Sequence, residues 1–214
     1  MKVLVTAGAT REPLDAVRFF SNVSTGRTGT ALAVALARLG HEVTLLRSEG
    51  TEPPADRTLP ATTFSSAADL QNRLQRQLAA GRYGAVIMTA AVADYRPESP
   101  VPGKLDSAAP ELTLRLVRNA KILPQLRGFS PAPLCVIGFK LTAGATTAAR
   151  QAAVAAQFAA GGVDAVVHND LAEIRAATAH PFHFFTAASR PPRELSGAAA
   201  LAGAIDAHLR GVSA

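Results

Sequence analysis

The stretch from Arg18 to Gly29 combines side chains that can bind an anion. It reads RFFSNVSTGRTG and is dense in hydroxyl, amide, glycine and arginine residues. An Ala- and Leu-rich segment at helical spacing follows it and ends at Gly40. Because a helix N-terminus carries free N–H groups and a partial positive charge, it attracts phosphate or carboxylate. The sequence predicts an anion cradle here, and the alternative is ordinary capping of the helix by Ser24 or Thr25.

The residues before this cradle are typical of a nucleotide-binding α/β fold. A buried-type strand over Lys2–Thr6 turns at Gly8, but the dinucleotide fingerprint G-x-G-x-x-G does not follow. A long polar loop, Ala9–Thr25, separates this strand from the helix. Loops of this length in compact domains are usually functional. Gly26 and Gly29 would let a ligand approach the backbone closely. A nicotinamide cofactor is therefore not the first expectation.

Polar residues follow three further predicted strands. These stretches are Thr89–Pro97, Gly138–Gly144 and Val166–Leu171. In a parallel sheet the carboxyl ends of the strands share one edge, where ligands bind. Asp94, Phe139 and Lys140 are therefore candidates for one composite site. Each also has a structural reading as an ordinary turn or core residue.

The elements that position these residues alternate along the chain. Strands are predicted over Lys2–Thr6, Glu42–Arg47, Ala85–Thr89, Leu134–Lys140 and Asp164–His168. Helices are predicted over Gly29–Leu39, Ala67–Ala80, Ala120–Leu126, Thr146–Ala160 and Gly197–Leu209. This alternation indicates an α/β, Rossmann-like parallel sheet with helices on both faces. The segments Glu111–Asn119 and His183–Leu195 are predicted as short antiparallel additions.

One segment interrupts this pattern. The stretch Arg96–Pro110 contains four prolines and a glycine, so it is not expected to form regular structure. It is either a surface connector or a mobile flap over the site, near residues 97–110. The 214 residues are expected to form a single domain, 1–214, that is large enough to bury a core.

Composition limits the functional classes. No apolar run reaches about 18 residues, so no membrane span is predicted, and the absence of a charged-then-apolar leader favours a cytoplasmic protein. The single cysteine, Cys135, lies in an apolar run and is expected to be a packed thiol. A net charge of +6 suggests anionic partners. Because no basic run with interleaved aromatics occurs, a small phosphorylated ligand is expected rather than nucleic acid. The five histidines show no metal-ligand spacing, so no metal residue is assigned.

Taken together, the motifs resemble the phosphopantothenate–cysteine ligase family over nearly the whole chain and in order. They are TAGATREPLDAVRFFSNVSTGRTGTALA, MTAAVADYRP, GKLDS followed by LTLRLVRNAKIL, GFKL and VVHNDL. The resemblance implies a ligase of coenzyme A biosynthesis. CTP or ATP, with Mg²⁺, would activate 4′-phosphopantothenate as an acyl-nucleotide, and cysteine would then attack. It also implies a homodimer, and a stand-alone synthetase without FMN, since the decarboxylase that is often fused is absent.

The resemblance also assigns roles by position. The catalytic residues would be Asn22, which holds the acyl group, and Lys104, in the flap. The substrate-binding residues would be Arg18, Asn22 and Ala90. The nucleotide-binding residues would be Gly8, Ser24, Gly26, Arg27, Asp94, Phe139 and Lys140. A flexible cation that closes over a site can stabilise charge in a transition state, which suits Lys104.

The chain departs from the family pattern at several positions. Arg27 replaces a lysine in STGRTG. Two lysines that grip the triphosphate in many CTP-dependent members correspond by position to Gln157 and Gly161. The hypothesis that follows is that Lys140 replaces them, and strict CTP preference stays open.

Two other functions remain as alternatives. The first is an NADP-linked Rossmann-type reductase, which the missing glycines and the missing Tyr-x-x-x-Lys pair disfavour. The second is a non-catalytic phosphate-binding module, since a fold alone does not fix a function. The presence of Arg18, Asn22 and Lys104 together argues against it.

Overall fold

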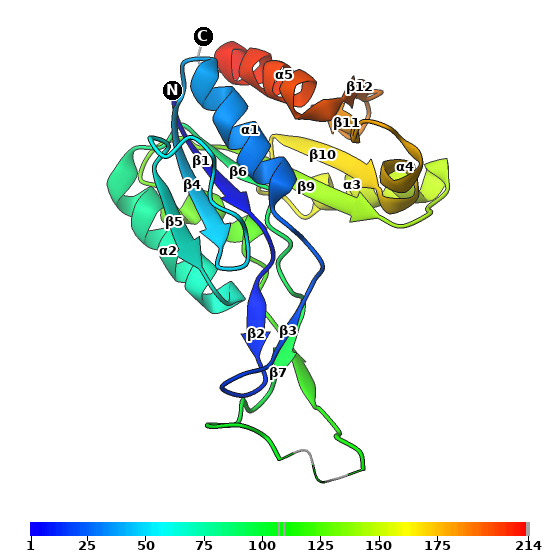
Figure 1. Ribbon diagram of the computed structural model, residues 1–214. Coiled ribbons are helices and arrows are strands. Elements are labelled where there is room, and N and C mark those ends of the chain that lie inside the picture. Colours follow the sequence, from blue (N-terminus) through cyan, green and yellow to red (C-terminus); the bar gives the residue numbers. More distant parts are fainter. Residues whose placement is uncertain (107, 109, 213–214) are drawn as a thin grey trace.

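The centre of the protein is a sheet of eight strands (Figure 1). The computed structural model describes residues 1–106, 108 and 110–212. The strands are β1 (Lys2–Ala7), β4 (Glu42–Ser48), β5 (Ala61–Phe64), β6 (Ala85–Met88), β9 (Cys135–Thr142), β10 (Ala165–Asp170), β11 (Pro181–Phe185) and β12 (Arg193–Ser196). Their spatial order is β12-β11-β10-β9-β6-β1-β4-β5. The strands from β10 to β5 in this order are parallel, and β11 and β12 add antiparallel pairs at one edge.

Helices cover both faces of the sheet (Figure 1). On one face lie α1 (Arg27–Arg38) and α5 (Gly197–Val212), and on the other lie α2 (Ala67–Gly81), the 3₁₀ helix η1 (Leu123–Phe129) and α3 (Thr147–Ala159). A short helix, α4 (Leu171–Ala176), follows β10. Successive strand residues point to opposite faces, so Val3 and Val5 pack with α1 whereas Leu4 packs with α2. Burial on both faces explains why these strands are continuous apolar runs.

The predicted α/β architecture is confirmed, including the antiparallel hairpin within His183–Leu195, which forms β11 and β12. Two short elements, β5 and α4, were not expected. The helix predicted over Ala120–Leu126 is wrong, because the chain forms η1 instead. Pro124 lacks an N–H and its ring clashes with the preceding turn, so a regular helix cannot run through it from Ala120.

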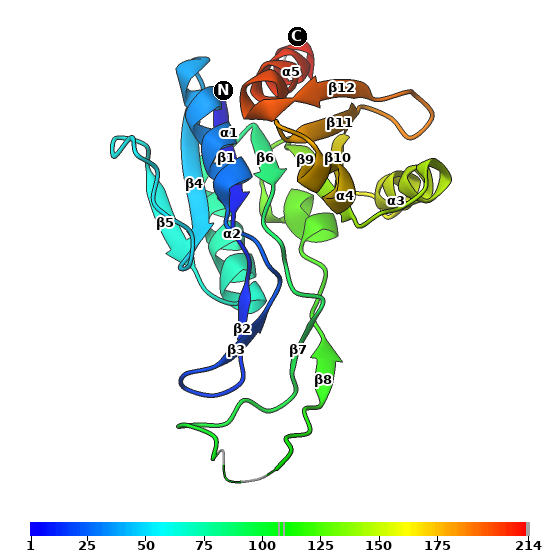
Figure 2. The ribbon, with the colours of Figure 1, turned by 45° about the vertical axis from the view of Figure 1, so that its right-hand side comes forward.

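Two small antiparallel ribbons form an arm that projects from the sheet (Figures 1 and 2). One ribbon pairs β2 (Arg11–Pro13) with β3 (Phe19–Ser21), and the other pairs β7 (Tyr95–Pro97) with β8 (Leu116–Arg118). The expected loop Ala9–Thr25 thus contains a hairpin, with the Arg11 guanidinium 4.6 Å from the Phe19 ring centroid. Glu12 ties the arm to the body, since its buried carboxylate accepts the Ala67 N–H at the start of α2, at 2.9 Å.

The antiparallel strand expected over Glu111–Asn119 is much shorter than predicted, because only β8 pairs. The described residues of the segment predicted as a flap, residues 97–110, run along the far end of this arm. Ser107 and Ala109 of that prediction lie outside the described residues.

Cys135 is a packed thiol, as predicted. It is buried at the start of β9, and burial, together with the nearby Asp164 carboxylate, raises the pKa of the thiol to about 12. A thiol this hard to ionise is a poor nucleophile. Across residues 1–106, 108 and 110–212, no helix combines the length and the apolar character needed to span a membrane.

Candidate active site

The loops that follow β1 and β6 run together at the carboxyl edge of the sheet. The Ala91 N–H donates to the Gly8 carbonyl at 2.8 Å, and the Thr10 N–H donates to the Ala91 carbonyl at 3.2 Å. The strand order reverses at β1, because β4 lies on one side of it and β6 on the other. Open α/β sheets bind ligands at the carboxyl edge beside such a reversal. The Ala90 N–H donates to the Thr6 hydroxyl at 3.0 Å. Ala90 therefore offers a ligand its carbonyl and its small side chain, not its N–H.

The first turn of α1 lacks a side-chain cap. Its N-cap is Gly26, in the left-handed conformation at φ 74°, and no side chain accepts a capping hydrogen bond. The Thr25 hydroxyl accepts long hydrogen bonds from the Arg27 backbone N–H, at 3.4 Å, and from the Arg27 Nε, at 3.3 Å. Ordinary capping by Ser24 or Thr25 is thus not what the structure contains. This helix end carries a partial positive charge, and the Arg27 side chain beside it lines a groove, as an anion cradle requires.

The glycines of this region are required for packing, because a side chain at any of them would meet the protein. A Cβ on Gly8 would lie 2.2 Å from the Thr51 hydroxyl, and one on Gly26 would lie 2.5 Å from the Thr51 methyl. A Cβ on Gly29 would lie 2.8 Å from the Thr6 carbonyl oxygen. The space beside each glycine is therefore occupied by the protein. Their absent side chains let the turn after β4 and the sheet close on α1.

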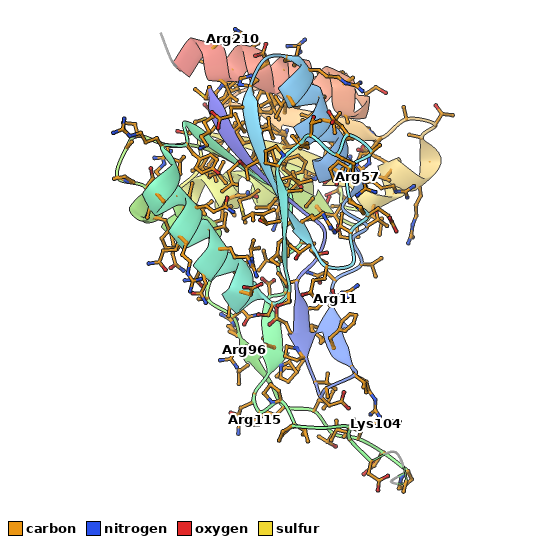
Figure 3. All side chains as sticks on the ribbon, turned by 60° about the vertical axis from the view of Figure 1, so that its left-hand side comes forward. Arg11, Arg57, Arg96, Lys104, Arg115 and Arg210 are labelled. Atoms are coloured by element: carbon orange, nitrogen blue, oxygen red, sulfur yellow. The ribbon has the colours of Figure 1, made fainter. Side chains whose placement is uncertain are left out.

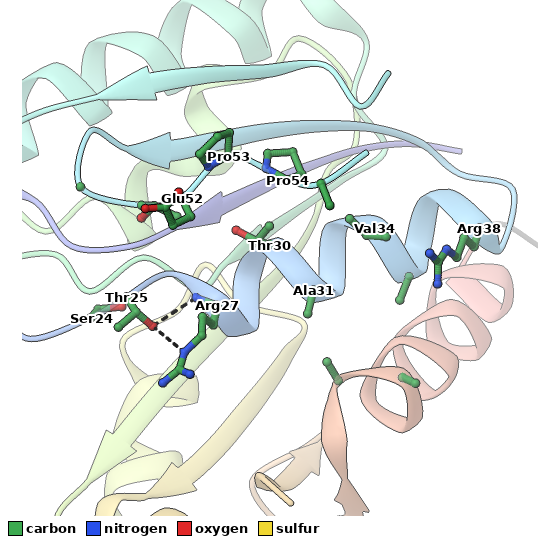
Figure 4. Close-up of a pocket in the computed structure, with 16 residues that line it drawn as sticks. Ser24, Thr25, Arg27, Thr30, Ala31, Val34, Arg38, Glu52, Pro53 and Pro54 are labelled. Carbon is green, nitrogen blue, oxygen red and sulfur yellow. Dashed lines mark hydrogen bonds between the residues drawn. The ribbon is translucent and has the colours of Figure 1, made fainter. Parts of the chain in front are cut away.

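A groove of about 880 Å³ runs along α1 (Figure 4). Its walls are α1, the loop over residues 50–55 and the first turn of α5. Of the predicted site residues, Ser24 and Arg27 line it, whereas Asp94, Phe139 and Lys140 are not part of its lining. This groove therefore brings together only two of the predicted site residues.

Asn22 and Asp94 come together at the base of the arm. The Asn22 amide donates to the Val92 carbonyl at 3.3 Å, two residues before Asp94. The exposed Asp94 carboxylate lies 2.5 Å from the Lys121 ammonium. Asn119 holds the backbone of this turn, since its side-chain amide donates to the Ala93 carbonyl at 2.9 Å. Asn119 and Lys121 were missed by the sequence reasoning, although Lys121 is one of only four lysines.

The neighbouring residues Phe139 and Lys140 lie on opposite faces of β9. Half-buried Phe139 packs against the core on the α1 and α5 face. Lys140, also half-buried, lies on the α3 side and is in register with His168 of β10. Within the part of the chain that the structure describes, the Lys140 side chain has no hydrogen bond or ion pair. An unpaired, half-buried cation at this edge is suited to an anionic ligand.

The polar end of β10 is structural. The buried Asp170 carboxylate accepts hydrogen bonds from the Thr142 hydroxyl at 2.6 Å and from the Gly144 and Ala145 N–H groups. The Thr142 hydroxyl, followed by these N–H groups, holds the pKa of Asp170 far below its usual value. Burial and the neighbouring His183 lower the pKa of His168, so it is neutral at neutral pH. These side chains fix the loop after β9.

The two positions expected to have lost triphosphate lysines differ in where they lie. Gln157 is in the last turn of α3, and Gly161 follows that helix and precedes β10, at the amino edge of the sheet. The Gln157 side chain reaches β9 at Gly138, which pairs with Met88, the last residue of β6. The Gln157 amide packs on Gly138, where a Cβ would approach it to 2.2 Å. The replacement of a lysine by Gln157 therefore stays a prediction about charge near this part of β9.

Arg18 and Lys104 lie on the arm. Lys104 is exposed near the arm's free end, far along it from Arg11 at its base (Figure 3). The Arg18 guanidinium donates to the Leu105 carbonyl at 3.1 Å. Within one chain, the structure does not bring Lys104 to the sheet edge that carries Asn22 and Asp94.

A resident metal has no donor set among the described residues, where no three His, Cys, Asp or Glu side chains gather. Magnesium usually binds through substrate phosphates and one or two carboxylates, so it would arrive with a nucleotide.

Comparison with known proteins identifies the family. Residues 1–190 match the model described as the DNA/pantothenate metabolism flavoprotein C-terminal domain. The coenzyme A biosynthesis bifunctional protein CoaBC of Thermococcus kodakarensis is 32% identical over 171 residues, which are 79% of this chain and 41% of that protein. The chain spans less than half the length of such curated relatives.

Solved structures share the fold. A DNA/pantothenate metabolism flavoprotein from Streptococcus pneumoniae superposes with a TM-score of 0.86 at 24% identity, covering 99% of both chains. A variant of Cab2, solved with phosphopantothenate-cysteine, superposes with a TM-score of 0.78 at 18% identity, covering 98% of this chain and 86% of that one. With nearly nine-tenths of its residues matched by the family model, the chain belongs to the DNA/pantothenate metabolism flavoprotein C-terminal domain family.

Proposed function

We propose that the protein is a phosphopantothenate–cysteine ligase of coenzyme A biosynthesis. The observation that carries this proposal is the family match over residues 1–190, which includes the motifs at the carboxyl edge of the sheet. The relatives named for coenzyme A biosynthesis and the neighbour solved with phosphopantothenate-cysteine point to the same chemistry. The family match gives no support to the reductase alternative.

The proposed reaction has two steps. A carboxylate oxygen of 4′-phosphopantothenate attacks the α-phosphorus of a nucleoside triphosphate, the bond to the β-phosphate oxygen breaks, and pyrophosphate leaves. The amine of cysteine then attacks the acyl carbon, the acyl–oxygen bond breaks, and nucleoside monophosphate leaves as the nitrogen loses a proton. Asn22 would hold the acyl group, and the first turn of α1 with Arg27 would bind phosphate.

The remaining roles follow from position. Asp94 and Phe139 would contact the nucleotide, together with the backbone around Gly8, Ser24 and Gly26. Ala90 would lie against the substrate. The nucleotide would be CTP or ATP with Mg²⁺, and the enzyme would act in the cytoplasm. Incubation with 4′-phosphopantothenate, cysteine, Mg²⁺ and either nucleotide, followed by mass spectrometry, tests the proposal. Phosphopantothenoylcysteine is the expected product, and its absence with both nucleotides would reject the ligase.

We also propose that two copies of the chain complete the site. The arm exposes apolar side chains that a monomer would be expected to bury. They are Val17, Phe19, Phe20, Val23, Tyr95, Leu112, Leu114 and Leu116, and Val23 is fully exposed. A homodimer that pairs these arms would bring Lys104 of one copy toward Asn22 of the other. Light scattering should give twice the chain mass of 22.1 kDa.

Lys140 is proposed to contact the triphosphate. Replacing Lys140 with alanine removes an unpaired cation at the carboxyl edge, so the KM for nucleotide should rise about tenfold. The KM for 4′-phosphopantothenate should change far less. Steady-state kinetics with each substrate varied in turn measures both values. Lys2→Ala, at the amino end of β1, is the control. An unchanged nucleotide KM would exclude this role for Lys140.

A further inference from the structure

A buried carboxylate, that of Asp15, holds the base of the flap. The segment Leu14–Arg18 lies against the flap segment Val101–Leu105. The Ala16 N–H donates to the Gly103 carbonyl at 2.8 Å, and the Val101 N–H donates to the Leu14 carbonyl at 2.9 Å. The two segments are about 90 residues apart in the chain, yet they are bonded on both sides of Lys104.

Asp15 links these segments through both of its carboxylate oxygens. Its Oδ1 accepts the Val17 N–H at 2.8 Å and the Arg18 N–H at 2.6 Å, which closes the local turn. Its Oδ2 accepts the Leu105 N–H at 3.0 Å and lies 3.7 Å from the Arg18 Nε. The Arg18 guanidinium in turn donates to the Leu105 carbonyl at 3.1 Å. One carboxylate thus fixes Arg18 and the residue next to Lys104.

We propose that Asp15 is a positioning residue that couples the substrate-binding Arg18 to the flap and fixes where Lys104 is presented. This inference rests on the proposed function for the roles of Arg18 and Lys104. Lys104 itself is exposed, while its neighbours Gly103 and Leu105 are both bonded to the Leu14–Arg18 segment. The backbone at Lys104 is therefore placed before any ligand binds, and its side chain stays free to reach one.

If Asp15 only stabilised its own turn, its second carboxylate oxygen, Oδ2, would need no partner. An Asx turn needs only the bonds that Oδ1 makes to Val17 and Arg18. Asp15 is only 6% exposed, so a carboxylate there must be compensated by donors. The Leu105 N–H does most to lower the pKa of Asp15, burial opposes it, and the Val17 and Arg18 N–H groups add to the lowering. The Leu105 N–H, across on the flap, is thus one of the three backbone donors that compensate this charge.

The Asp15→Asn variant separates the local turn from the contact with the flap. An asparagine can keep its oxygen on the Val17 and Arg18 N–H groups, and its NH₂ then faces the Leu105 N–H, so two donors meet. The variant should retain its turn and lose its hold on the flap. Hydrogen–deuterium exchange of the 101–106 segment should become about tenfold faster, while α2 should exchange as in the unmodified protein. Unchanged exchange in the 101–106 segment would overturn the proposal.

Kinetics then test the consequence for catalysis. A displaced Lys104 should lower kcat about tenfold or more, with the nucleotide KM changed less than about threefold. The matched control is Asp56→Asn, because Asp56 accepts the Thr58 N–H at 2.9 Å in the same i to i+2 geometry, in an exposed loop. Faster exchange with an unchanged kcat would overturn the positioning role. If the unmodified protein has no ligase activity, the proposed function fails. Hydrogen–deuterium exchange of the 101–106 segment still tests whether Asp15 holds the flap.

A second variant covers the case in which Asp15→Asn does not fold. Gly103 has φ +87°, and a Cβ there would meet nothing within 4 Å. Gly103→Ala therefore strains the flap through its backbone alone, without a clash. It should make hydrogen–deuterium exchange of the 101–106 segment faster and should lower kcat, as Asp15→Asn does. A Gly103→Ala protein with unmodified exchange and kcat would contradict the coupling.

Discussion

Replacing Lys104 with alanine should lower kcat by about two to three orders of magnitude and leave the fold intact. The side chain is exposed near the free end of the arm, so its removal costs no packing. If its ammonium stabilises charge that develops during acyl transfer, the loss appears in kcat rather than in KM. Steady-state kinetics with both substrates saturating measures it.

The control is Arg115→Ala, which removes another exposed cation near the same end of the arm. That variant should keep kcat within about threefold of the unmodified protein, since it tests only the charge of the arm. A Lys104→Ala enzyme with unchanged kcat would remove Lys104 from the mechanism.

The same variant can show which chain supplies Lys104. Inactive Lys104→Ala and Asn22→Ala subunits are mixed and allowed to exchange. If the lysine acts on the partner, half of the dimers are mixed and each has one intact site, so about a quarter of the activity returns. No recovery is expected if Lys104 and Asn22 act within one chain.

Gly29→Ala should destabilise the protein by about 3 kcal/mol, because the close approach of α1 to the sheet leaves no room for a methyl group. A Cβ at this position would lie 2.2 Å from the Thr89 hydroxyl and 2.8 Å from the Thr6 carbonyl oxygen. The helix must shift, and its first turn would move with it. Urea denaturation of both proteins gives the difference in unfolding free energy.

Gly203→Ala is the matched control for this substitution. Gly203 lies inside α5, where a Cβ would meet nothing within 4 Å. Alanine should stabilise that helix by about 0.5–1 kcal/mol, because it lowers the entropy of the unfolded chain. Equal effects at Gly29 and Gly203 would contradict the account of packing at the α1 N-terminus.

The parts of the fold that followed from the sequence are those with strong local signals. The strands β1, β9 and β10 each begin with an apolar run, and α2 and α5 have clear helical spacing. Elements with weak local signals were not predicted. The three-residue strands of the arm are stabilised by contacts such as Glu12 with the N-terminus of α2, which no local pattern reveals.

The candidate site shows the same division. Motifs indicated Asn22, Asp94 and Phe139 as residues at one edge, whereas the partners that hold that edge come from distant parts of the chain. Lys121 reaches Asp94 across 27 residues, and Asp15 reaches Leu105 across 90. Gly8 and Gly26 were predicted as nucleotide-binding residues, and the sequence did not reveal that Thr51 fills the space that a side chain at either position would need. Tertiary contacts decide these roles, and spacing along the chain does not encode them.

Pyrophosphate release in the absence of cysteine tests the ligase account most directly. The protein is mixed with Mg²⁺, 4′-phosphopantothenate and CTP or ATP, and pyrophosphate is followed before and after cysteine is added. The account predicts a burst of about one pyrophosphate per site that needs 4′-phosphopantothenate, followed by steady turnover once cysteine is present. Folded protein that releases no pyrophosphate with either nucleotide, or releases it without 4′-phosphopantothenate, would contradict the account.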